Sequence, residues 1–350
     1  MGAPIIETST WSPSEYDMVI DVRSPSEFLD DHIPGAVNMP VLSDIERADV
    51  GTIYKQQSSF IARKKGASLV ARNIAGHLEN QLHELGSGFI PLIHCWRGGQ
   101  RSRALAQICS EIGWKSYILK GGYKSYRRDV LSGLDETAIN LTFIVISGRT
   151  GSGKTDILKE LKNQGAQVLD LEGLAVHRGS LLGKIENRIQ PGQRLFESNL
   201  YSDILKFNCR KPIYVESESS RIGNVQIPRG IWQQIVTAPM VSIAVPLSAR
   251  ALYLMTEYSH LMADLSDLNR LVSAMKKRHG DARIEIWSDL IKAKDWQRLA
   301  EDLLHTHYDP AYDKSIGRHD RPLLATIEQQ DCLRNNLKAT VNQILHLTRN

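Results

Sequence analysis

Cysteine is scarce in this chain of 350 residues, and its four cysteines form no CxxC pair. This scarcity argues against a disulfide scaffold and against a zinc ribbon, and it fits a reducing compartment. Long apolar runs are missing too: no stretch approaches the roughly 18 apolar residues that a membrane span requires. Residues 1–17 hold no apolar signal core. We therefore expect a cytoplasmic protein with no membrane partner.

A strong excess of charge is also missing, since 43 Lys and Arg face 39 Asp and Glu, a net charge of +4. Such a mildly basic balance permits a nucleic-acid partner without demanding one. Hydrophobic residues at 42% and charged residues at 23% are ordinary globular values. The length predicts two domains, each large enough to bury a core.

One cysteine, Cys95, stands in a segment that is typical of an activated thiol. The apolar run Phe89–Ile93 before it predicts a buried strand, and apolar residues at helical spacing follow over 104–112. Cys95 is therefore expected at a strand-to-helix turn, where loop amides and the helix dipole favour an anion. Arg97 and Arg101 add positive charge, which lowers a thiol pKa. The segment predicts a thiolate in a cradle for a tetrahedral anion; a buried structural cysteine is the alternative.

Strands and helices alternate through the first 130 residues. Met18–Val22 and Ser116–Leu119 are predicted strands, and apolar spacing over Val70–Leu85 predicts a helix. This alternation indicates a doubly wound α/β domain over residues 1–130, with its site at the carboxyl end of a strand. Polar residues then predict a linker over residues 131–140.

A phosphate-binding loop opens the second domain, predicted over residues 141–350. The strand run Leu141–Ile146 leads into Gly148–Thr155, a complete GxxxxGK[ST] motif, and helical spacing follows. Lys154 is expected to meet terminal phosphates, and Thr155 is a candidate Mg²⁺ ligand. The remaining candidate phosphate-binding residues of the loop are Gly148, Gly151, Ser152 and Gly153. We expect a P-loop NTPase-like α/β domain whose part beyond Arg250 is mainly helical.

Several polar residues at predicted strand ends are candidates for the same site. Glu216 ends the apolar run Pro212–Val215 and is the better candidate for a residue that orients a metal or a water. Asp170 is a weaker one. Polar loops that follow strand ends carry the candidate substrate contacts. These are His177, Arg178 and Arg194, for which ordinary surface positions are the alternative.

A basic segment near the carboxyl end bears tryptophans. Lys276–His279 and Arg283 lie close in sequence to Trp287 and Trp296. Such a face suits RNA, through phosphate contacts and base stacking. A charge run of this kind is also compatible with a solvated surface.

The first domain resembles the rhodanese (sulfurtransferase) family. The resemblance rests on Asp21–Arg23, Glu27–Phe28, His32–Ala36, the Cys95 loop and Leu119–Tyr123. It implies a cysteine that becomes a persulfide beside an anion site. The basic residue lies farther away than in typical sulfurtransferase loops, at Cys-x5-Arg, which suits a bulkier anion such as a phosphate derivative. The same spacing also satisfies the cysteine-phosphatase signature, so that activity remains a rival.

With both domains taken together, the chain resembles the bacterial tRNA 2-selenouridine synthase family over nearly its entire length. The additional segments that carry this resemblance are Asp170–Ala175, His177–Ser180, Gln193, Phe196–Ser198, Val215–Ser219 and His307–Tyr312. It implies a transferase that replaces the sulfur of wobble 2-thiouridine in tRNA by selenium from selenophosphate. It also implies an S-geranyl-2-thiouridine intermediate made with geranyl diphosphate. A selenophosphate-supplying enzyme is then a candidate partner.

Two questions stay open at this point. Cys95 is either a covalent carrier of selenium or a group that assists the departure of geranylthiol. A geranyl chain also needs an apolar groove, and the sequence does not show which residues form it. The alternative activity is a rhodanese-type sulfurtransferase or cysteine phosphatase fused to a nucleotide-dependent, kinase-like domain. A non-catalytic sulfur carrier or RNA-binding module is the other class.

Overall fold

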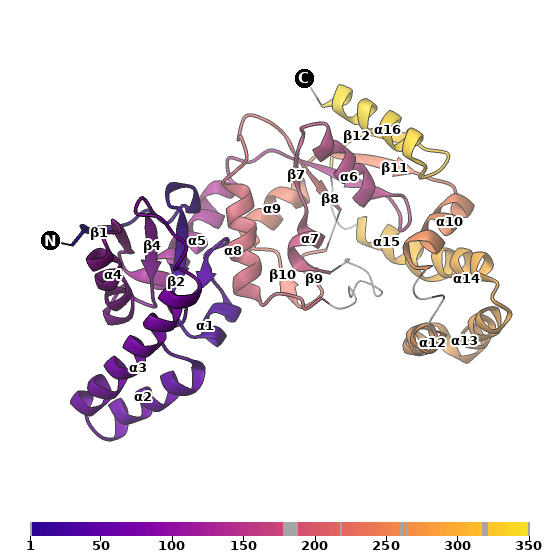
Figure 1. Cartoon of the computed structure of the whole chain (residues 1–350). Helices are drawn as coiled ribbons and strands as arrows, with labels where there is room; N and C mark the ends of the chain where they lie inside the picture. Colours follow the sequence, from indigo (N-terminus) through magenta and orange to yellow (C-terminus); the bar gives the residue numbers. More distant parts are fainter. Residues whose placement is uncertain are drawn as a thin grey trace. The chain divides into compact units, whose positions relative to one another are not determined.

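The computed structural model describes residues 2–177, 188–217, 219–259, 262, 265–316 and 321–348. The chain forms two compact units, Met1–Leu134 with Gln190–Ser202, and Asp135–Ile189 with Asp203–Asn350. Each unit contains a five-stranded sheet whose strands are all parallel. Figure 1 labels the elements of both units. The predicted fold class, a rhodanese-like α/β domain followed by a P-loop α/β domain with a helical part, is confirmed.

The first unit has the strand order β1-β5-β4-β2-β3. Its elements are β1 (Ile5–Thr8), η1 (Pro13–Glu15), β2 (Met18–Asp21), α1 (Pro25–Asp30), β3 (Val37–Asn38), α2 (Asp44–Gln56), α3 (Ser59–Asn80), β4 (Pro91–His94), α4 (Gln100–Ile112), β5 (Ser116–Leu119) and α5 (Gly122–Ala138). All four residues of the central strand β4 are buried. The apolar run before Cys95 is continuous because a central parallel strand is covered on both faces.

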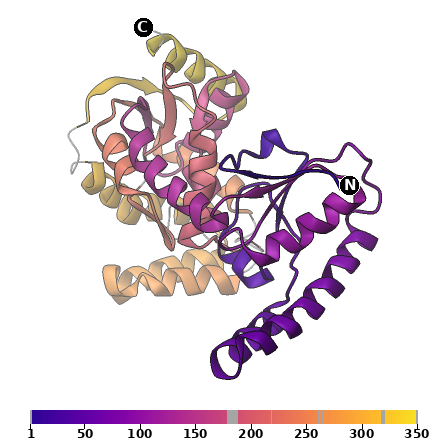
Figure 2. The same cartoon turned by 90° about the vertical axis from the view of Figure 1, so that its left-hand side faces the viewer.

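The helices α2 and α3 form a hairpin that extends away from the sheet of this unit (Figures 1 and 2). A capping box starts α2, in which Ser43 accepts from the amide of Glu46 and the Glu46 carboxylate accepts from the amide of Ser43. The sequence predicted only a helix over 70–85. The helix α3 instead begins at Ser59 and ends at Asn80, and Leu82 packs into the core from the following turn.

The linker expected over residues 131–140 is mostly helix, because α5 continues to Ala138. Leu134 is buried, and the polar residues that suggested a linker lie on the exposed side of the last turn. A second difference concerns Gln190–Ser202, which was expected in the second domain and belongs to the first unit. Its helix α8 (Gln193–Ile204) packs on α5, where Arg127 forms an ion pair with Glu197.

The second unit has the strand order β12-β11-β6-β8-β7, with a separate antiparallel pair of β9 and β10. Its elements are β6 (Phe143–Ser147), α6 (Lys154–Asn163), β7 (Gln167–Leu169), α7 (Leu171–Ala175), β8 (Ile213–Glu216), β9 (Arg221–Ile222), β10 (Val225–Gln226), α9 (Arg229–Thr237), β11 (Met240–Ala244), α10 (Leu247–Glu257), α12 (Leu265–Ala274), α13 (Lys276–Ala293), α14 (Trp296–Leu303), η2 (Leu304–Tyr308), α15 (Asp309–Ile316), β12 (Leu323–Glu328) and α16 (Arg334–Leu347). The strand β6 is wholly buried, and α6 and α16 share one apolar core with the sheet. Among the described residues, no helix combines the length and apolar character that crossing a membrane requires.

Of the two tryptophans in the basic segment, Trp287 is not exposed for the stacking on RNA that the sequence suggested. Trp287 is fully buried, and its indole N–H donates to the Asp302 carboxylate at 2.6 Å. Arg283 forms an ion pair with the same carboxylate. Trp296 packs against the core of α12, α13 and α14. Apolar packing between short helices therefore explains both rings, and the predicted Trp-bearing RNA face is wrong for Trp287.

Two histidines in this helical part predict a loss of stability in acid. A hydrogen bond of 2.8 Å joins His279 Nε2 and His307 Nδ1. Burial, with the positive charge of Arg278, lowers the pKa of His307 to about 4, and burial lowers the pKa of His279 as well. The unfolded chain therefore binds more protons than the folded chain between pH 6.5 and about pH 4. Stability is expected to fall as the pH is lowered through that window.

The measurement is the thermal midpoint against pH for the wild type, His307→Gln and the exposed control His305→Gln. His307→Gln should show a shallower loss of midpoint between neutral and acid pH, while His305→Gln should follow the wild type. Equal slopes for all three proteins would exclude the histidine pair as the cause.

Two candidate active sites

Backbone hydrogen bonds hold the Cys95 loop against the turn that begins α5. The amides of Tyr123 and Lys124 donate to the carbonyls of Cys95 and Trp96 at 2.8 and 3.0 Å. Gly98 has φ +66°, and a Cβ there would come within 2.6 Å of the Leu119 carbonyl oxygen. Only glycine tolerates both the conformation and the close approach. The loop is thereby fixed at the carboxyl end of β4, with α4 beginning at Gln100.

The thiol of Cys95 is buried, yet its pKa is lowered. Burial alone raises the pKa, but hydrogen bonds from Ser102 and from loop amides, together with the charge of Arg101, outweigh it. The amide of Gly99 donates to Cys95 Sγ at 3.2 Å, and Ser102 Oγ lies 3.4 Å from the sulfur. Such donors stabilise a thiolate. The geometry supports the activated thiol that the sequence indicated.

The two predicted basic residues of this loop differ in their surroundings. Arg97 is exposed. Arg101 is half-buried, and its guanidinium donates to the Glu27 carboxylate at 3.0 Å. Glu27 also binds Arg47, at 2.9 Å. Arg101 thus contributes positive potential to the thiol while a carboxylate holds its side chain.

A buried charge network lies beside the loop. The Arg23 guanidinium makes hydrogen bonds of 3.0 and 2.6 Å to Asp21 and of 2.6 Å to the Asp31 carbonyl. It also lies 3.9 Å from the ring centre of Tyr123, which is the residue whose amide binds Cys95 O. Cation–π contact and ion pairing compensate the buried charge. Asp21 and Arg23 therefore form a buried ion pair in contact with Tyr123, the residue whose amide holds the Cys95 loop.

The second site is the loop between β6 and α6. Gly151 and Gly153 have φ of +83° and +72°, and a Cβ on Gly151 would come within 2.9 Å of the Arg250 carbonyl oxygen. The helix α6 begins at Lys154, so its free amides and its dipole face the loop. The structure thus has the strand, glycine loop and helix that a phosphate-binding loop requires.

Glu216 lies next to this loop, as the sequence suggested. The strand β8 neighbours β6, and Glu216 is in register with Ile146. Its carboxylate is 3.4 Å from Lys154 Nζ and accepts from Thr155 Oγ1 at 3.2 Å. A hydroxyl and a carboxylate are oxygen ligands of the kind that Mg²⁺ prefers, so the residues present fit that ion.

Sequence reasoning missed the residues that brace the loop from far along the chain. Tyr312 Oη accepts from the Gly148 amide at 2.5 Å and lies 2.7 Å from Ser147 Oγ. Arg250 is buried, donates to the Thr150 carbonyl at 3.1 Å and makes a paired 2.8 Å contact with Asp309. The only signal in the sequence was that the segment His307–Tyr312 is one of those that carry the family resemblance. The spacing of its residues did not indicate a role for any of them.

The weaker candidates make local contacts. Asp170 caps α7 by accepting from the Gly173 amide at 2.8 Å. His177 follows α7, and its amide donates to the Glu172 carbonyl. Arg194 belongs to the first unit, where it forms an ion pair with Asp30 at 2.7 Å. Arg178 lies outside the described residues.

Two family models match successive parts of the chain. A family model described as a rhodanese-like domain matches residues 9–129, and one described as the tRNA 2-selenouridine synthase AAA domain matches residues 141–343. Fold and loops therefore define a rhodanese-like domain joined to a P-loop domain.

Relatives identify the family. The tRNA 2-selenouridine synthase of Bdellovibrio bacteriovorus is 34% identical over 348 residues, covering 86% of this chain and 89% of its own. That of Shewanella sediminis is 34% identical, covering 86% and 88%. That of Nitrosomonas europaea is 37% identical over 244 residues, covering 69% and 63%. The chain belongs to the tRNA 2-selenouridine synthase family.

Proposed function

We propose that this chain replaces the sulfur of 2-thiouridine at the tRNA wobble position by selenium, as a transferase with two anion sites. The observation that carries the proposal is the presence of two built anion loops, the lowered-pKa Cys95 loop and the Gly148–Thr155 loop. The activity for which the relatives are named supports the product. We assign the thiol chemistry to residues 1–130 and the phosphate chemistry to residues 141–350.

In the first step, geranyl diphosphate binds with its diphosphate on the Gly148–Thr155 loop. The thiocarbonyl sulfur of 2-thiouridine attacks C1 of the geranyl group, the carbon–oxygen bond breaks, and diphosphate leaves while N3 of the base loses its proton. Lys154 and the α6 amides stabilise the departing charge, and Thr155 with Glu216 would hold Mg²⁺. Alkylation turns a poor leaving group into a better one.

In the second step, selenophosphate occupies the Cys95 loop, where the α4 amides and Arg97 and Arg101 favour a tetrahedral anion. Selenium attacks C2 of the alkylated base and geranylthiolate leaves. The Cys95 thiol, which the donors around its sulfur make more acidic, protonates that leaving group and becomes the thiolate that those donors stabilise. Water then cleaves the selenium–phosphorus bond to release phosphate, and the thiolate takes up a proton again. The sum is S-geranyl-2-thiouridine, selenophosphate and water giving 2-selenouridine, geranylthiol and phosphate.

The partners follow from these steps. They are tRNA, geranyl diphosphate and selenophosphate as co-substrates, and an enzyme that supplies selenophosphate in the cytoplasm. Mass spectrometry of nucleosides tests the function, using tRNA that carries 2-thiouridine with each donor alone, both donors, or ATP in place of geranyl diphosphate. Both donors together should give 2-selenouridine, and geranyl diphosphate alone should give the S-geranyl nucleoside. Unchanged 2-thiouridine with both donors would reject the proposal.

A further inference from the structure

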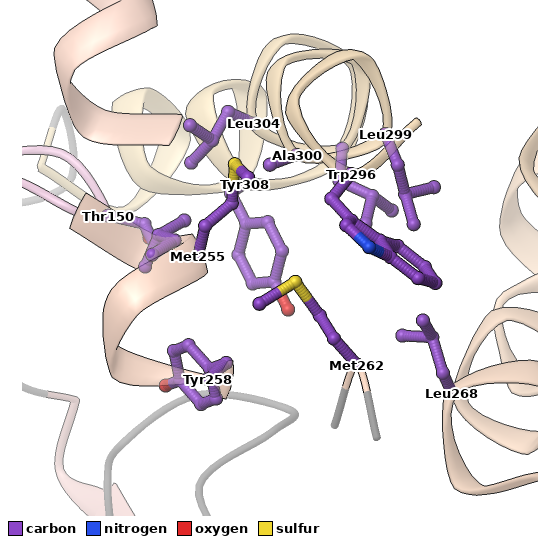
Figure 3. A pocket seen from close by; sticks show the side chains of 12 residues that line it. Thr150, Met255, Tyr258, Met262, Leu268, Trp296, Leu299, Ala300, Leu304 and Tyr308 are labelled. Atoms are coloured by element: carbon purple, nitrogen blue, oxygen red, sulfur yellow. The ribbon is translucent and has the colours of Figure 1, made fainter. Parts of the chain in front are cut away.

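An apolar pocket lies beside the phosphate loop in the second unit (Figure 3). Its empty volume is about 650 Å³, a figure that includes the open mouth. The loop residue Thr150 stands at one side. Met255 from α10, Trp296 and Ala300 from α14, and Tyr308 from η2 close the others.

One helix joins this pocket to the phosphate loop. The first turn of α10 carries Arg250, which donates to the Thr150 carbonyl, and the next turn carries Leu254, which lines the pocket. A Cβ on Gly151 would meet both Arg250 and Leu254. Asp309 accepts two further hydrogen bonds from the Arg250 guanidinium and directly follows Tyr308 in the opposite wall. Loop and pocket wall are therefore held in one fixed arrangement.

The lining cannot satisfy a polar ligand. Nearly all of its surface is apolar, so a nucleobase or ribose there would lose its hydrogen bonds to water without replacement. The hydroxyl of the lining residue Tyr308 is buried, so it does not offer the pocket an open hydrogen-bonding group. Two methionines, Met255 and Met262, add flexible side chains that adapt to irregular apolar shapes. The site as a whole suits a ligand with an anionic head and a hydrocarbon chain.

We propose that this pocket holds the hydrocarbon chain of a prenyl diphosphate whose diphosphate lies on the Gly148–Thr155 loop. The proposal rests on the proposed function and adds the location and the length limit of the chain. Ala300 lies on the α14 wall between Leu304 and Trp296, so a larger side chain there reduces the space available to the prenyl group (Figure 3). Trp296 lies on the side of the pocket away from Thr150, so its removal lengthens that space.

The experiment is calorimetric titration of the full chain with inorganic diphosphate and with dimethylallyl, geranyl and farnesyl diphosphates. The wild type should bind geranyl diphosphate at least about tenfold more tightly than inorganic diphosphate, since burial of each methylene adds affinity. Ala300→Phe should remove most of that gain for geranyl diphosphate and keep the binding of inorganic diphosphate. Trp296→Ala should shift the preference towards farnesyl diphosphate. Ala293→Phe, at the exposed end of α13, is the control and should match the wild type.

The outcomes separate the two levels of the account. A wild type that binds geranyl and inorganic diphosphate equally would overturn the prenyl step of the proposed function along with this inference. A wild type that prefers geranyl diphosphate, with chain-length preference unchanged in both Ala300→Phe and Trp296→Ala, would overturn the pocket assignment alone. Unchanged binding of inorganic diphosphate shows that each variant is folded.

Discussion

Cys95→Ala is expected to lower the rate of 2-selenouridine formation by about 10²–10⁴-fold, the range for loss of a positioned proton donor. Hydrogen bonds from Ser102 and the loop amides lower the pKa of the Cys95 thiol, although burial alone would raise it. The P-loop lies in the other unit and is untouched. The variant should therefore still form S-geranyl-2-thiouridine and accumulate it. Quantification of both nucleosides after a fixed time measures the effect.

Cys109→Ala is the matched control for this variant. Cys109 is fully buried in the same core, and burial raises its pKa to about 11, so it is a packing residue with an inert thiol. We expect it to cost about 1 kcal/mol of stability and to leave the rate of selenation nearly unchanged. A Cys95→Ala protein that selenates at the wild-type rate would remove Cys95 from the mechanism.

Lys154→Ala is expected to slow prenyl transfer by about 10²–10³-fold, as for other single charge-stabilising donors. The Lys154 ammonium lies 3.4 Å from Glu216 at the start of α6, where the diphosphate would depart. Its loss removes a positive charge from that point, while the Cys95 loop keeps its geometry. The variant should fail on tRNA that carries 2-thiouridine, yet convert tRNA supplied already geranylated when selenophosphate is present.

Lys159→Ala is the control on the same helix. Lys159 is exposed, and its partner is Asp156 rather than the phosphate loop. It should retain both conversions, as judged by nucleoside analysis on the two tRNA substrates side by side. Equal loss of both conversions in a folded Lys154→Ala protein would point to one shared active site or to a nucleotide-driven mechanism.

Sequence reasoning could reach the core of each site because the determinants are local. A strand, a loop and a helix start within about a dozen residues place Cys95, and the same order places Lys154 and Thr155. Glu216 was also reachable, because parallel strands end at the same edge of a sheet and its strand neighbours β6.

What the sequence could not give depends on packing between distant segments. Tyr312 and Asp309 brace a loop about 160 residues earlier, and periodicity does not reveal such a contact. Trp287 was read as an exposed ring because its neighbours are basic, yet the ring is buried and only the flanking charges are solvated. Arg194 was assigned by chain order to the second domain, whereas its helix packs on α5 of the first unit.

The most direct test of the two-step account is a chase. tRNA is first alkylated with deuterated geranyl diphosphate, freed of the donor, and then given fresh protein and selenophosphate alone. The account predicts that the S-geranyl nucleoside disappears as 2-selenouridine forms in equal amount, with deuterated geranylthiol released. Selenouridine that forms only when prenyl diphosphate is added again, or that forms without release of geranylthiol, would contradict it.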